Sequence, residues 1–455
     1  MVNRRELLQA GLAFLAPPAA QSKPNVLFIL ADDLGWADLA CYGSTLHETP
    51  NLDRLAESGM KFTCAYTAGA VCSPTRASIM TGQYPARVGI TDYIPGLKVE
   101  DRRLRAPEDL HQLPLDQVTI GEALRAGGYQ TFYGGKWHLG GAGFSPAEQG
   151  FEVHVEEGGG PRDGTTANRY TSGCLKFLDE RDAKRPFFAF VSYNEPHTPI
   201  IAREPYIGHF KRKVAALPPL AEPFIRERDG LTRVRQDNAD YASVLSALDE
   251  HVGKLLAKLD ELKLAGNTVV IFTSDNGGLA THAKGGPTSN APLRSGKGWL
   301  YEGGTRVPLM VRAPGVTRSG SVCRAPVIST DYYPTLLELG GLPLAPKQHC
   351  DGMSLASLLR GRAGLDRTTL YWHYPHYHGS TWAPGGALRE GDWKLIEFFD
   401  EDTVELYRLS DDLGERRNLA GQMPDRVKQL RAKLAAWRKE AGAVMPTPNP
   451  AWTRK

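Results

Sequence analysis

The residues best suited to chemistry lie in one short stretch, residues 71–82, which reads Val-Cys-Ser-Pro-Thr-Arg-Ala-Ser-Ile-Met-Thr-Gly. Pro74 suits the first turn of a helix, because its fixed φ fits there and its missing N–H is not needed. Cys72 then lies at the helix N-terminus, where free N–H groups and the helix dipole favour an anion. Arg76 lies one turn further on the same face. The stretch predicts a nucleophile beside a fixed cation; a structural cysteine before an ordinary helix is the plainer alternative.

Oxygen-bearing side chains follow two apolar runs. Residues 26–31 and 268–273 are largely apolar, as expected of strands buried on both faces. Each run is followed at once by side chains that can donate oxygen ligands, which are Asp32, Asp33, Asp275 and Asn276. Adjacent carboxylates are costly to bury unless a cation lies near them, and an all-oxygen set favours calcium or magnesium over zinc. A helix N-cap and an Asn-Gly turn are the alternatives.

Four basic side chains lie in loops rich in glycine or proline, and they are Lys136, His138, His197 and Lys297. The first two follow a short strand predicted at residues 130–133, and the third follows a buried strand predicted at residues 186–193. A lysine is a compact point charge that suits an anionic oxygen, and a histidine can move a proton near neutral pH. Solvated lysines and packing histidines are the alternatives for each residue taken alone.

The predicted strands alternate with helices. Strands are expected at residues 26–31, 130–133, 186–193, 268–273 and 307–311, and helices at residues 119–126, 237–264 and 331–337. Polar candidates follow the first four strands. Ligands of open α/β sheets bind beyond the carboxyl ends of the strands. We therefore predict that these candidates converge on one site.

Beyond residue 365 the pattern changes to short segments. Antiparallel strands are expected at residues 368–373, 386–389, 393–399 and 405–409, and an amphipathic helix at residues 424–439. We predict a catalytic domain over residues 24–365 and a small C-terminal domain, an antiparallel sheet with a helix, over residues 366–455. Within it, His373 and His376 lie among aromatic residues, and Arg389 follows. These three residues are candidates for binding a sugar, with plain packing as the alternative.

The composition narrows the possible functions. The chain of 455 residues is long enough for a large core and two domains, and its formal net charge of +3 gives no electrostatic footprint for nucleic acid. Six cysteines are too few and too scattered for a disulfide scaffold. We expect the five cysteines other than Cys72 to be small buried residues, with one structural disulfide left open.

The N-terminus has the pattern of a targeting segment. Arg4 and Arg5 precede a modestly apolar run at residues 7–16, which is followed by Pro-Pro-Ala-Ala. The run is too short to span a membrane, and the twin arginine is typical of a Tat-type export signal. We predict that residues 1–23 direct export to a periplasm or beyond and that the mature chain has no stable membrane span; a cytoplasmic tail is the alternative.

Several motifs together resemble one known family. Cys72-x-Pro-x-Arg76 followed by Ala-Ser and Thr-Gly, the Gly-Lys-Trp-His-Leu-Gly motif at residues 135–140, and the glycine-rich block at residues 296–308 are similar to the signatures of the type I sulfatases. The resemblance runs from about residue 25 to the end of the chain. It implies the alkaline-phosphatase-like α/β fold, with a large, mixed, mostly parallel sheet covered by helices on both faces and a small C-terminal α+β domain.

The resemblance also implies two cofactors. In that family the cysteine at the position of Cys72 is oxidised after translation to formylglycine by a maturation enzyme, and the hydrated aldehyde is the nucleophile that attacks sulfur. A single calcium ion is implied at Asp32, Asp33, Asp275 and Asn276, with an oxygen of the converted Cys72 as a further ligand. Arg76 is expected to hold the hydrate, and calcium to lower the pKa of the hydrate.

The remaining roles complete a hypothesis for sulfate ester hydrolysis. Lys136 and Lys297 hold sulfate oxygens, His197 with Lys297 protonates the departing alcohol, and His138 takes the proton of the second hydroxyl. The substrate is expected to be a sulfated carbohydrate of the galactose or N-acetylgalactosamine type. Two alternatives remain: a phosphoester or phosphonate ester hydrolase of the same superfamily, and an inactive glycan-binding homologue.

Overall fold

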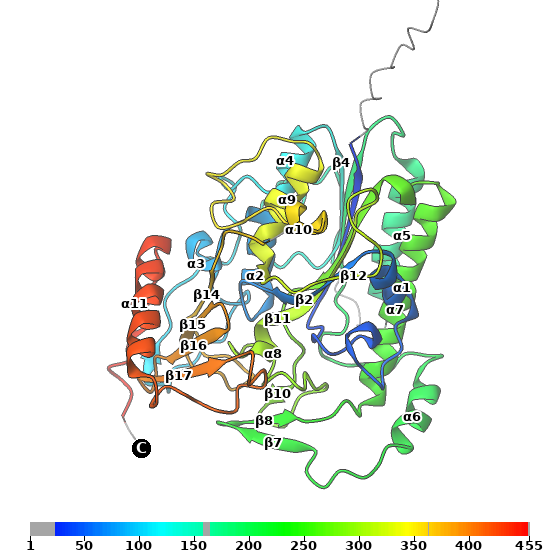
Figure 1. Cartoon of the computed structure of the whole chain (residues 1–455). Coiled ribbons are helices and arrows are strands. Elements are labelled where there is room, and N and C mark those ends of the chain that lie inside the picture. The colour runs from blue at the N-terminus through cyan, green and yellow to red at the C-terminus, as the bar shows by residue number, and fades with distance from the viewer. Residues whose placement is uncertain (1–22, 158–163, 363, 454–455) are drawn as a thin grey trace, which may run out of the picture.

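The computed structural model describes residues 23–157, 164–362 and 364–453. Its centre is one large mixed sheet (Figure 1). In spatial order the strands are β12 (Ser321–Cys323), β2 (Met60–Tyr66), β11 (Arg306–Arg312), β9 (Thr268–Ser274), β1 (Asn25–Ala31), β6 (Phe187–Ser192), β4 (Gln130–Gly135) and β5 (Val153–Val155), and β13 (Val327–Ile328) also pairs with β2. All five strands predicted for the large sheet are therefore present.

Most of the sheet is parallel. β1 lies between β6 and β9 and is parallel to both, and β4 is parallel to β6. β11 is antiparallel to both β9 and β2. Two antiparallel steps restore the direction, so β2 runs the same way as β1. The carboxyl ends of β1, β2, β4, β6 and β9 and the start of β11 consequently lie on one side of the sheet.

Helices cover both faces of the sheet, as predicted (Figure 1). One face carries α1 (Pro50–Ser58), α5 (Thr165–Glu180) and α7 (Ala239–Glu261); the other carries α2 (Cys72–Thr81), α4 (Ile120–Ala126), α9 (Tyr332–Leu339) and α10 (Ala356–Leu359). β1 shows why the chain builds this layering. Val26, Phe28 and Leu30 belong to one core cluster, and Leu27, Ile29 and Ala31 belong to the other. Because alternate side chains of a strand point to opposite faces, an unbroken apolar run needs cover on both.

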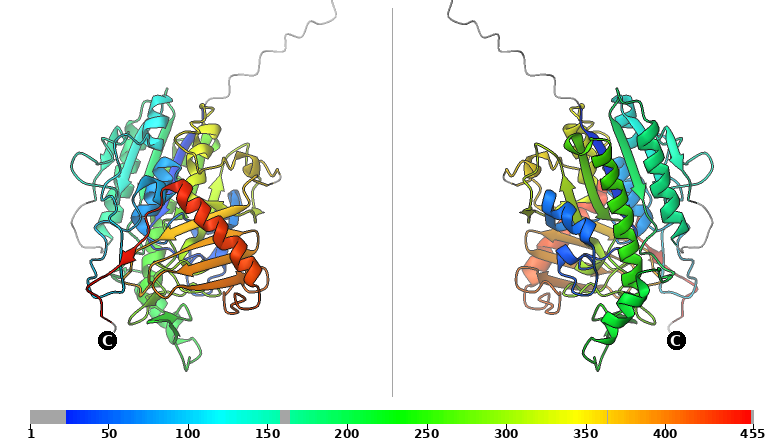
Figure 2. Two further views of the ribbon diagram at one scale, coloured as in Figure 1. Left: turned by 90° about the vertical axis from the view of Figure 1, so that its left-hand side faces the viewer. Right: turned by 90° about the vertical axis from the view of Figure 1, so that its right-hand side faces the viewer.

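The C-terminal part forms the expected antiparallel sheet with a helix. Its strands are β14 (Thr369–Tyr374), β15 (Gly385–Glu390), β16 (Trp393–Phe398) and β17 (Thr403–Arg408) in sequential order. Helix α11 (Pro424–Ala441) lies across one face of this sheet (Figure 2) and packs Leu430, Leu434 and Trp437 into its core. The exact division of the chain between residues 365 and 366 stays a prediction.

Smaller elements surround these two sheets. A three-stranded sheet, in the order β10-β8-β7, projects from the large sheet beyond α8, and short strands β3 and β18 pair with each other. The bounds are α3 (Pro85–Val88), β3 (Leu104–Arg105), α6 (Ile207–Ala215), β7 (Phe224–Glu227), β8 (Gly230–Arg233), β10 (Thr281–His282), α8 (Glu302–Thr305) and β18 (Thr447–Pro448). Sequence patterns did not predict the three-stranded sheet, because its strands are only two to four residues long.

The two main sheets meet around buried charges that we call the junction cluster, Glu302, Arg306, Lys394 and Glu415. Lys394 Nζ lies 2.9 Å from Glu302 Oε1 and 3.2 Å from Glu415 Oε1, and Arg306 Nη1 lies 3.2 Å from Glu302 Oε2. Burial raises the pKa of Glu302, but Lys394 and Arg306 outweigh it and hold that pKa at about 2. Burial and the neighbouring Glu302 raise the pKa of Glu415 to about 7 in spite of Lys394.

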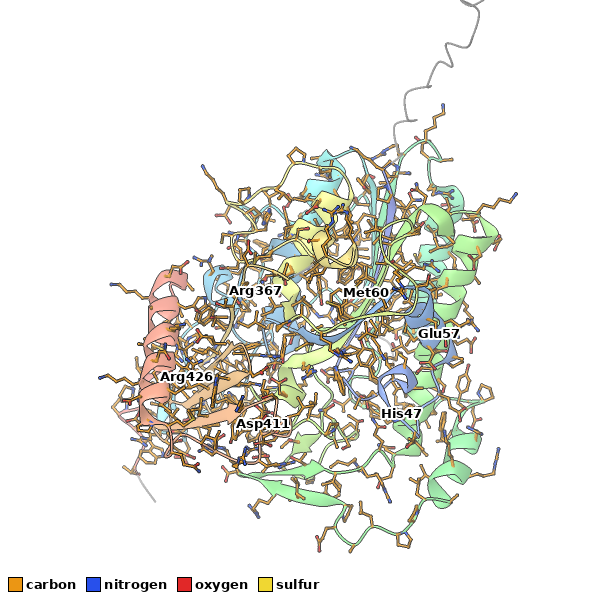
Figure 3. The ribbon with its side chains drawn as sticks, in the orientation of Figure 1. His47, Glu57, Met60, Arg367, Asp411 and Arg426 are labelled. Carbon is orange, nitrogen blue, oxygen red and sulfur yellow. The ribbon has the colours of Figure 1, made fainter. Side chains whose placement is uncertain are left out.

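A second ion pair fixes the chain where it enters the C-terminal sheet. Arg367 donates to both carboxylate oxygens of buried Asp331, each at 2.6 Å, and a guanidinium paired in this way has a fixed orientation. Figure 3 labels Arg367 on one side of the molecule and Glu57, an exposed residue of α1, on the other.

The cysteines and the N-terminal segment were also subjects of prediction. All six cysteines are free thiols, so the disulfide left open does not form. The expectation that the five cysteines other than Cys72 are buried is correct for Cys64 and Cys174 and wrong for Cys350, which is exposed in a surface turn before α10, while Cys41 and Cys323 are partly buried. The targeting segment lies outside the described residues except for Lys23. Among the described helices, each is too short or too polar to cross a bilayer.

Candidate active site

The structure brings the predicted polar residues of the large sheet together on its carboxyl side. We call this group the Cys72 cluster, and its members are Asp32, Asp33, Cys72, Arg76, Lys136, His197, Asp275, Asn276 and Lys297. Cys72 Sγ lies 3.5 Å from Asp32 Oδ1. One potential ligand atom from each of Asp32, Asp33, Cys72 and His197 falls within 4.8 Å of the others. The prediction that separate strand ends converge on one site is therefore confirmed.

Helix α2 positions Cys72. It begins at Cys72, after an extended Val71, and Pro74 occupies its first turn as predicted. Strand β2, which the sequence patterns missed, delivers the chain to this helix from the same side of the sheet as the aspartates. Cys72 is only 1% exposed. Burial alone would raise the pKa of its thiol, but Lys136 and Lys297 lower that pKa below its ordinary value.

Two lysines neutralise the adjacent aspartates that follow β1. Lys136 Nζ lies 2.6 Å from Asp32 Oδ2, and Lys297 Nζ lies 2.9 Å from Asp33. Burial opposes ionisation of both carboxyls, yet these lysines hold both pKa values below the ordinary value. Asp33 has a φ of 64°, in the left-handed region, so the chain leaves strand geometry at this residue. Both carboxylates can then face the same point, which successive strand residues could not do.

Asp275 and Arg76 form a buried ion pair in which two guanidinium nitrogens donate to one carboxylate oxygen. Arg76 Nε and Nη2 donate to Asp275 Oδ2 at 3.0 and 2.7 Å, and Nη1 donates to the Lys136 carbonyl at 2.5 Å and to Ser192 Oγ at 2.6 Å. Arg76 thus ties together the ends of β4, β6 and β9. Burial and the nearby Asp32 raise the pKa of Asp275 to about 8 despite Arg76. Burial and the crowding of carboxylates therefore oppose ionisation of Asp275, although Arg76 is bound to it.

Asn276 carries an unused ligand atom. Its Nδ2 donates to Asp33 Oδ1 at 2.8 Å and to the Gly277 carbonyl at 3.0 Å. Its Oδ1 is buried and has no hydrogen-bond partner among the described residues. A buried carbonyl oxygen without a partner is costly and calls for a donor or a cation. Together with the carboxylates around it, this oxygen completes an all-oxygen set that fits calcium.

The two histidines differ in tautomer. His197 Nδ1 lies 2.6 Å from the Thr198 carbonyl, so Nδ1 carries a proton and Nε2 faces Asp33 Oδ2 at 3.7 Å. Burial lowers the pKa of His197, but Asp33 and Asp32 outweigh it and raise that pKa above the ordinary value. His138 Nε2 lies 2.5 Å from the Ile94 carbonyl and its Nδ1 is buried without a partner among the described residues. Burial and Lys136 lower the pKa of His138 to about 3.

Three predicted substrate residues lie apart from the Cys72 cluster in their contacts. His373 Nε2 is bonded to the Val444 carbonyl at 2.9 Å, and His376 Nε2 to Thr91 Oγ1 at 2.8 Å. Arg389 contacts Cys64 and Tyr66 beside the junction cluster. All three are buried. These contacts give no support to a binding role, which stays a prediction, and the packing alternative accounts for what is seen.

Two residues near the cluster were not among the candidates. His378 lies at the end of the aromatic and histidine segment, and Tyr93 contacts it edge to face with ring centroids 5.5 Å apart. Burial and Asp92 raise the pKa of Tyr93 above its ordinary value. His378 lies in a segment that the sequence marked, whereas a single loop tyrosine gives no sequence signal.

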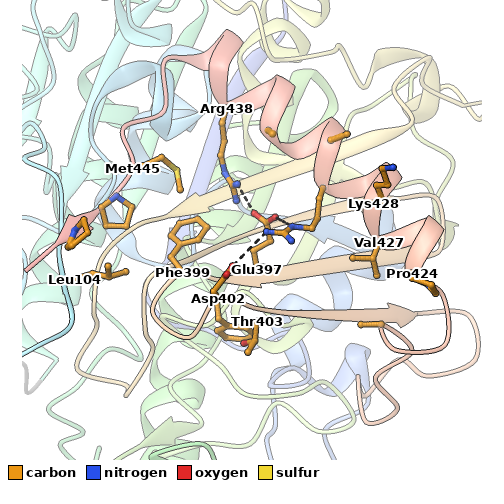
Figure 4. Close-up of a pocket in the computed structure, with 17 residues that line it drawn as sticks. Leu104, Glu397, Phe399, Asp402, Thr403, Pro424, Val427, Lys428, Arg438 and Met445 are labelled. Carbon is orange, nitrogen blue, oxygen red and sulfur yellow. Dashed lines mark hydrogen bonds and ion pairs between the residues drawn. The ribbon is translucent and has the colours of Figure 1, made fainter. Parts of the chain in front are cut away.

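A cavity of about 890 Å³ lies elsewhere, between α11 and the end of the C-terminal sheet (Figure 4). Arg431 and Arg438 pair with Glu397 within it at 2.8 and 2.6 Å, and Phe399 and Met445 supply apolar surface. None of its lining residues belongs to the Cys72 cluster. The volume of a cavity alone therefore does not identify the candidate active site of this molecule.

The fold and the site together are those of the alkaline-phosphatase-like hydrolases. The family model described as Sulfatase matches residues 24–342, and the model described as N-sulphoglucosamine sulphohydrolase, C-terminal, matches residues 295–440. The first match covers more than half of the chain. The chain belongs to the sulfatase family and is accordingly a sulfuric ester hydrolase.

Individual relatives agree with this assignment over nearly the whole chain. Human arylsulfatase A is 33% identical over 463 residues, covering 91% of this chain and 85% of the relative. N-acetylgalactosamine-6-sulfatase of Canis lupus familiaris is 30% identical over 454 residues, covering 92% and 80%. The crystal structure of Ps i-CgsB in complex with k-i-k-neocarrahexaose superposes with a TM-score of 0.76 at 26% identity and covers 95% of each chain. The predicted family and fold class are confirmed.

Proposed function

We propose that this enzyme removes sulfate from a sulfated carbohydrate, with formylglycine made from Cys72 as its nucleophile and one calcium ion as its metal. The arrangement of Cys72 carries this proposal. It lies at the start of a buried helix, 3.5 Å from Asp32, with Lys136 and Lys297 on either side of the aspartate pair. A buried anion-binding point of this kind suits a singly charged sulfate ester.

The residues present fit a calcium ion. Asp32, Asp33, Asp275 and Asn276 would hold it, together with an oxygen of the converted Cys72. The partnerless Asn276 Oδ1 and the raised pKa of Asp275 both support an added cation at this point. When bound, the ion supplies positive charge that favours the ionised form of the nucleophile. A maturation enzyme is required as a partner, because formylglycine arises from a cysteine by oxidation after translation.

The lysines and Arg76 prepare the site for sulfate. Each lysine ammonium has three donors, so it can bind a sulfate oxygen while keeping its aspartate. Arg76 is fixed by four hydrogen bonds to Asp275, Lys136 and Ser192. Its positive charge beside the nucleophile therefore needs no reorganisation when substrate binds. Loss of one such donor is worth about 2.7–4 kcal/mol of transition-state stabilisation.

The two histidines divide the proton transfers. His197 keeps Nδ1–H on the Thr198 carbonyl, so Nε2 is the nitrogen that faces Asp33, 3.7 Å away, and a proton held there can pass to the departing alcohol oxygen. His138 donates Nε2–H to Ile94, which leaves a lone pair on Nδ1. That lone pair can accept a proton from the nucleophile side. A sulfate bound at Lys136 would offset the lysine charge that now lowers the pKa of His138.

The substrate class rests on named relatives. Arylsulfatase A and N-acetylgalactosamine-6-sulfatase align over most of the chain, and the solved neighbour Ps i-CgsB forms a complex with k-i-k-neocarrahexaose. The names of these relatives support a sulfated carbohydrate as the substrate, and we infer a sugar of the galactose or N-acetylgalactosamine type. We further propose that residues 1–23 export the enzyme, which fits action on an external polymer.

Peptide mass spectrometry at Cys72 combined with aryl ester kinetics tests the proposal. In protein made with a maturation enzyme, the Cys72 peptide should show the mass of formylglycine, and 4-nitrophenyl sulfate should be cleaved at least about 100-fold faster than 4-nitrophenyl phosphate. Cys72→Ala should abolish turnover, whereas Cys350→Ala, at an exposed thiol, should not change it. Preference for the phosphate or a phosphonate ester would favour the alternative hydrolase. An intact thiol in the native host, without turnover, would favour the glycan-binding homologue.

A further inference from the structure

His378 links the Cys72 cluster to a second cavity. The residue lies in the loop between β14 and β15, and its ring packs against Gly298, the neighbour of Lys297. A Cβ atom at Gly298 would lie 2.2 Å from His378 Nδ1, so only glycine allows this approach. Tyr93 contacts the other side of the ring. His378 therefore stands at the rim of the sulfate site, on the C-terminal part of the chain.

The hydrogen bonds of His378 define which nitrogen is a donor. The backbone N–H of Ser380 donates to His378 Nδ1 at 3.1 Å, so Nδ1 must accept and the neutral ring carries its proton on Nε2. Burial and Lys297 lower the pKa of His378 to about 3, so the ring is neutral at physiological pH. His378 thus presents one fixed N–H donor at the rim.

The cavity that begins at His378 has a volume of about 840 Å³. One wall is the loop that follows β14, with Tyr377 and Ala383, and the opposite wall is the turn between β7 and β8 together with Ala283. A volume in the range of small-molecule sites, with an aromatic residue in the wall, suits a sugar. The residue that joins this cavity to the sulfate site is His378.

Carboxylates outnumber arginines on the lining of the cavity, and two of the arginines are held in ion pairs. Four arginines and five carboxylates line it. Arg228 lies 2.9 Å from Glu401 and 3.4 Å from Glu405, and Arg294 lies 2.6 Å from Glu227. Paired groups of this kind can exchange hydrogen bonds with hydroxyls. An added carboxylate or sulfate would meet a wall with more carboxylates than arginines, on which Arg228 and Arg294 are already engaged, and its desolvation would be poorly compensated.

We infer that this cavity binds an uncharged sugar unit next to the sulfated one, that His378 Nε2–H donates a hydrogen bond to the bound glycan, and that the cavity discriminates against a neighbouring uronate or second sulfate. The inference rests on the proposed sulfatase function and assigns a glycan with neutral units as the substrate class.

Competitive inhibition of 4-nitrophenyl sulfate hydrolysis tests the inference without knowledge of the sulfate position. The probes are a neutral galactotetraose and a tetragalacturonate, which differ in the carboxylate at carbon 6. The neutral tetrasaccharide should inhibit with a Ki at least about 10-fold below that of the uronate. Ala283→Trp, at an exposed cavity residue, should raise the Ki of the neutral probe about 10-fold.

Two variants of His378 distinguish the loss of its N–H donor from a general disturbance of the cavity. His378→Ala should raise the neutral Ki about 5-fold to 10-fold, and His378→Gln, which keeps an N–H donor, should recover part of the loss. Ala257→Trp, at an exposed alanine of α7, is the matched control and should leave both Ki values unchanged. Equal inhibition by both probes, stronger inhibition by the uronate, or no inhibition would overturn the inference. Absence of 4-nitrophenyl sulfate turnover in converted wild-type enzyme would instead contradict the proposed function.

Discussion

Two buried groups of charge in this molecule look alike in composition and differ in how they are completed. The junction cluster and the Cys72 cluster both mix carboxylates with lysine and arginine, away from solvent. In the junction cluster, Lys394 and Arg306 reach the two carboxylates within 3.2 Å, and Glu415 Oε1, which makes no hydrogen bond among the described residues, still lies 3.2 Å from the Lys394 ammonium. In the Cys72 cluster, three carboxylates lie close to Cys72, and Asn276 Oδ1 has no hydrogen-bond partner among the described residues. The oxygen left without a hydrogen bond is therefore a carboxylate oxygen beside a cation in one cluster and a neutral amide oxygen among carboxylates in the other.

Removing the Lys394 ammonium from the junction cluster should give the largest effect on stability. Lys394→Met leaves Glu302 and Glu415 buried side by side without their shared partner. We expect a loss of about 3–5 kcal/mol in the free energy of unfolding, because breaking a buried pair strands the remaining charge. Urea denaturation measures it. The kcat of the folded fraction for 4-nitrophenyl sulfate should stay within about 2-fold of wild type. Lys428→Met, at an exposed lysine of α11, is the control.

His197→Gln should lower activity and leave stability nearly unchanged, which is the reverse of the effect expected for Lys394→Met. The proposed role of His197 is to protonate a departing alcohol, so its loss should matter most when the leaving group is a poor one. We expect kcat/KM for a sugar sulfate to fall about 100-fold, and for 4-nitrophenyl sulfate less than about 10-fold. The free energy of unfolding should change little. His209→Gln, at a half-exposed surface histidine, is the matched control. An equal loss on both substrates would contradict a general acid role.

Sequence patterns could predict one of these clusters and not the other. Asp32, Asp33, Asp275 and Asn276 were predictable because each follows an apolar run, and the carboxyl ends of parallel strands meet. The junction cluster gave no such signal. Lys394 alternates with apolar residues as a solvated strand residue would, and Glu415, 113 residues beyond its partner Glu302, lies in a loop. Its pairing depends on the packing of two sheets, which no local pattern encodes.

Two details of the structure, strand β2 and the position of His378, were not predicted because they depend on tertiary packing and not on a local pattern. Strand β2 was missed because its sequence, Met-Lys-Phe-Thr-Cys-Ala-Tyr, mixes lysine and threonine into the apolar pattern, although it carries the chain to Cys72. Within the histidine-rich segment, the pattern could not separate buried His373 and His376 from His378 at the rim. That choice depends on the path of the loop after β14, which tertiary contacts with Gly298 and Tyr93 determine.

The junction cluster should also make the free energy of unfolding depend on pH, through the titration of Glu415. The pKa of Glu415 is raised to about 7 in the folded protein, against about 4.3 in an unfolded chain. The folded state therefore binds more protons in this window, and stability contributed by the protonated carboxyl is lost as pH rises through about 7. Glu415→Gln removes the effect and keeps the acceptor for the Glu302 N–H. Relative to wild type, its free energy of unfolding should rise by about 2 kcal/mol between pH 5 and pH 8. A constant difference over that range would contradict the raised pKa, and the variant's activity profile should match that of wild type.

Asn276→Ala tests the feature that separates the two clusters, at the smallest expected effect. Calcium that binds only the folded protein stabilises it by an amount that grows with affinity. Loss of one oxygen ligand should weaken calcium binding about 10-fold, which removes about 1.4 kcal/mol of calcium-dependent stabilisation at saturation. The measurement is the calcium-dependent shift in Tm of unconverted protein, so it needs neither formylglycine nor turnover.

Asn276→Asp keeps the oxygen and adds charge beside Asp33, so this variant should be less stable without calcium and show a larger shift in Tm with calcium. Glu415→Gln should keep the wild-type shift, because both carboxylates of the junction cluster already have the Lys394 ammonium within 3.2 Å. If Asn276→Ala responds to calcium as wild type does, the partnerless oxygen is not a ligand, and the distinction between the clusters would rest on the nucleophile alone.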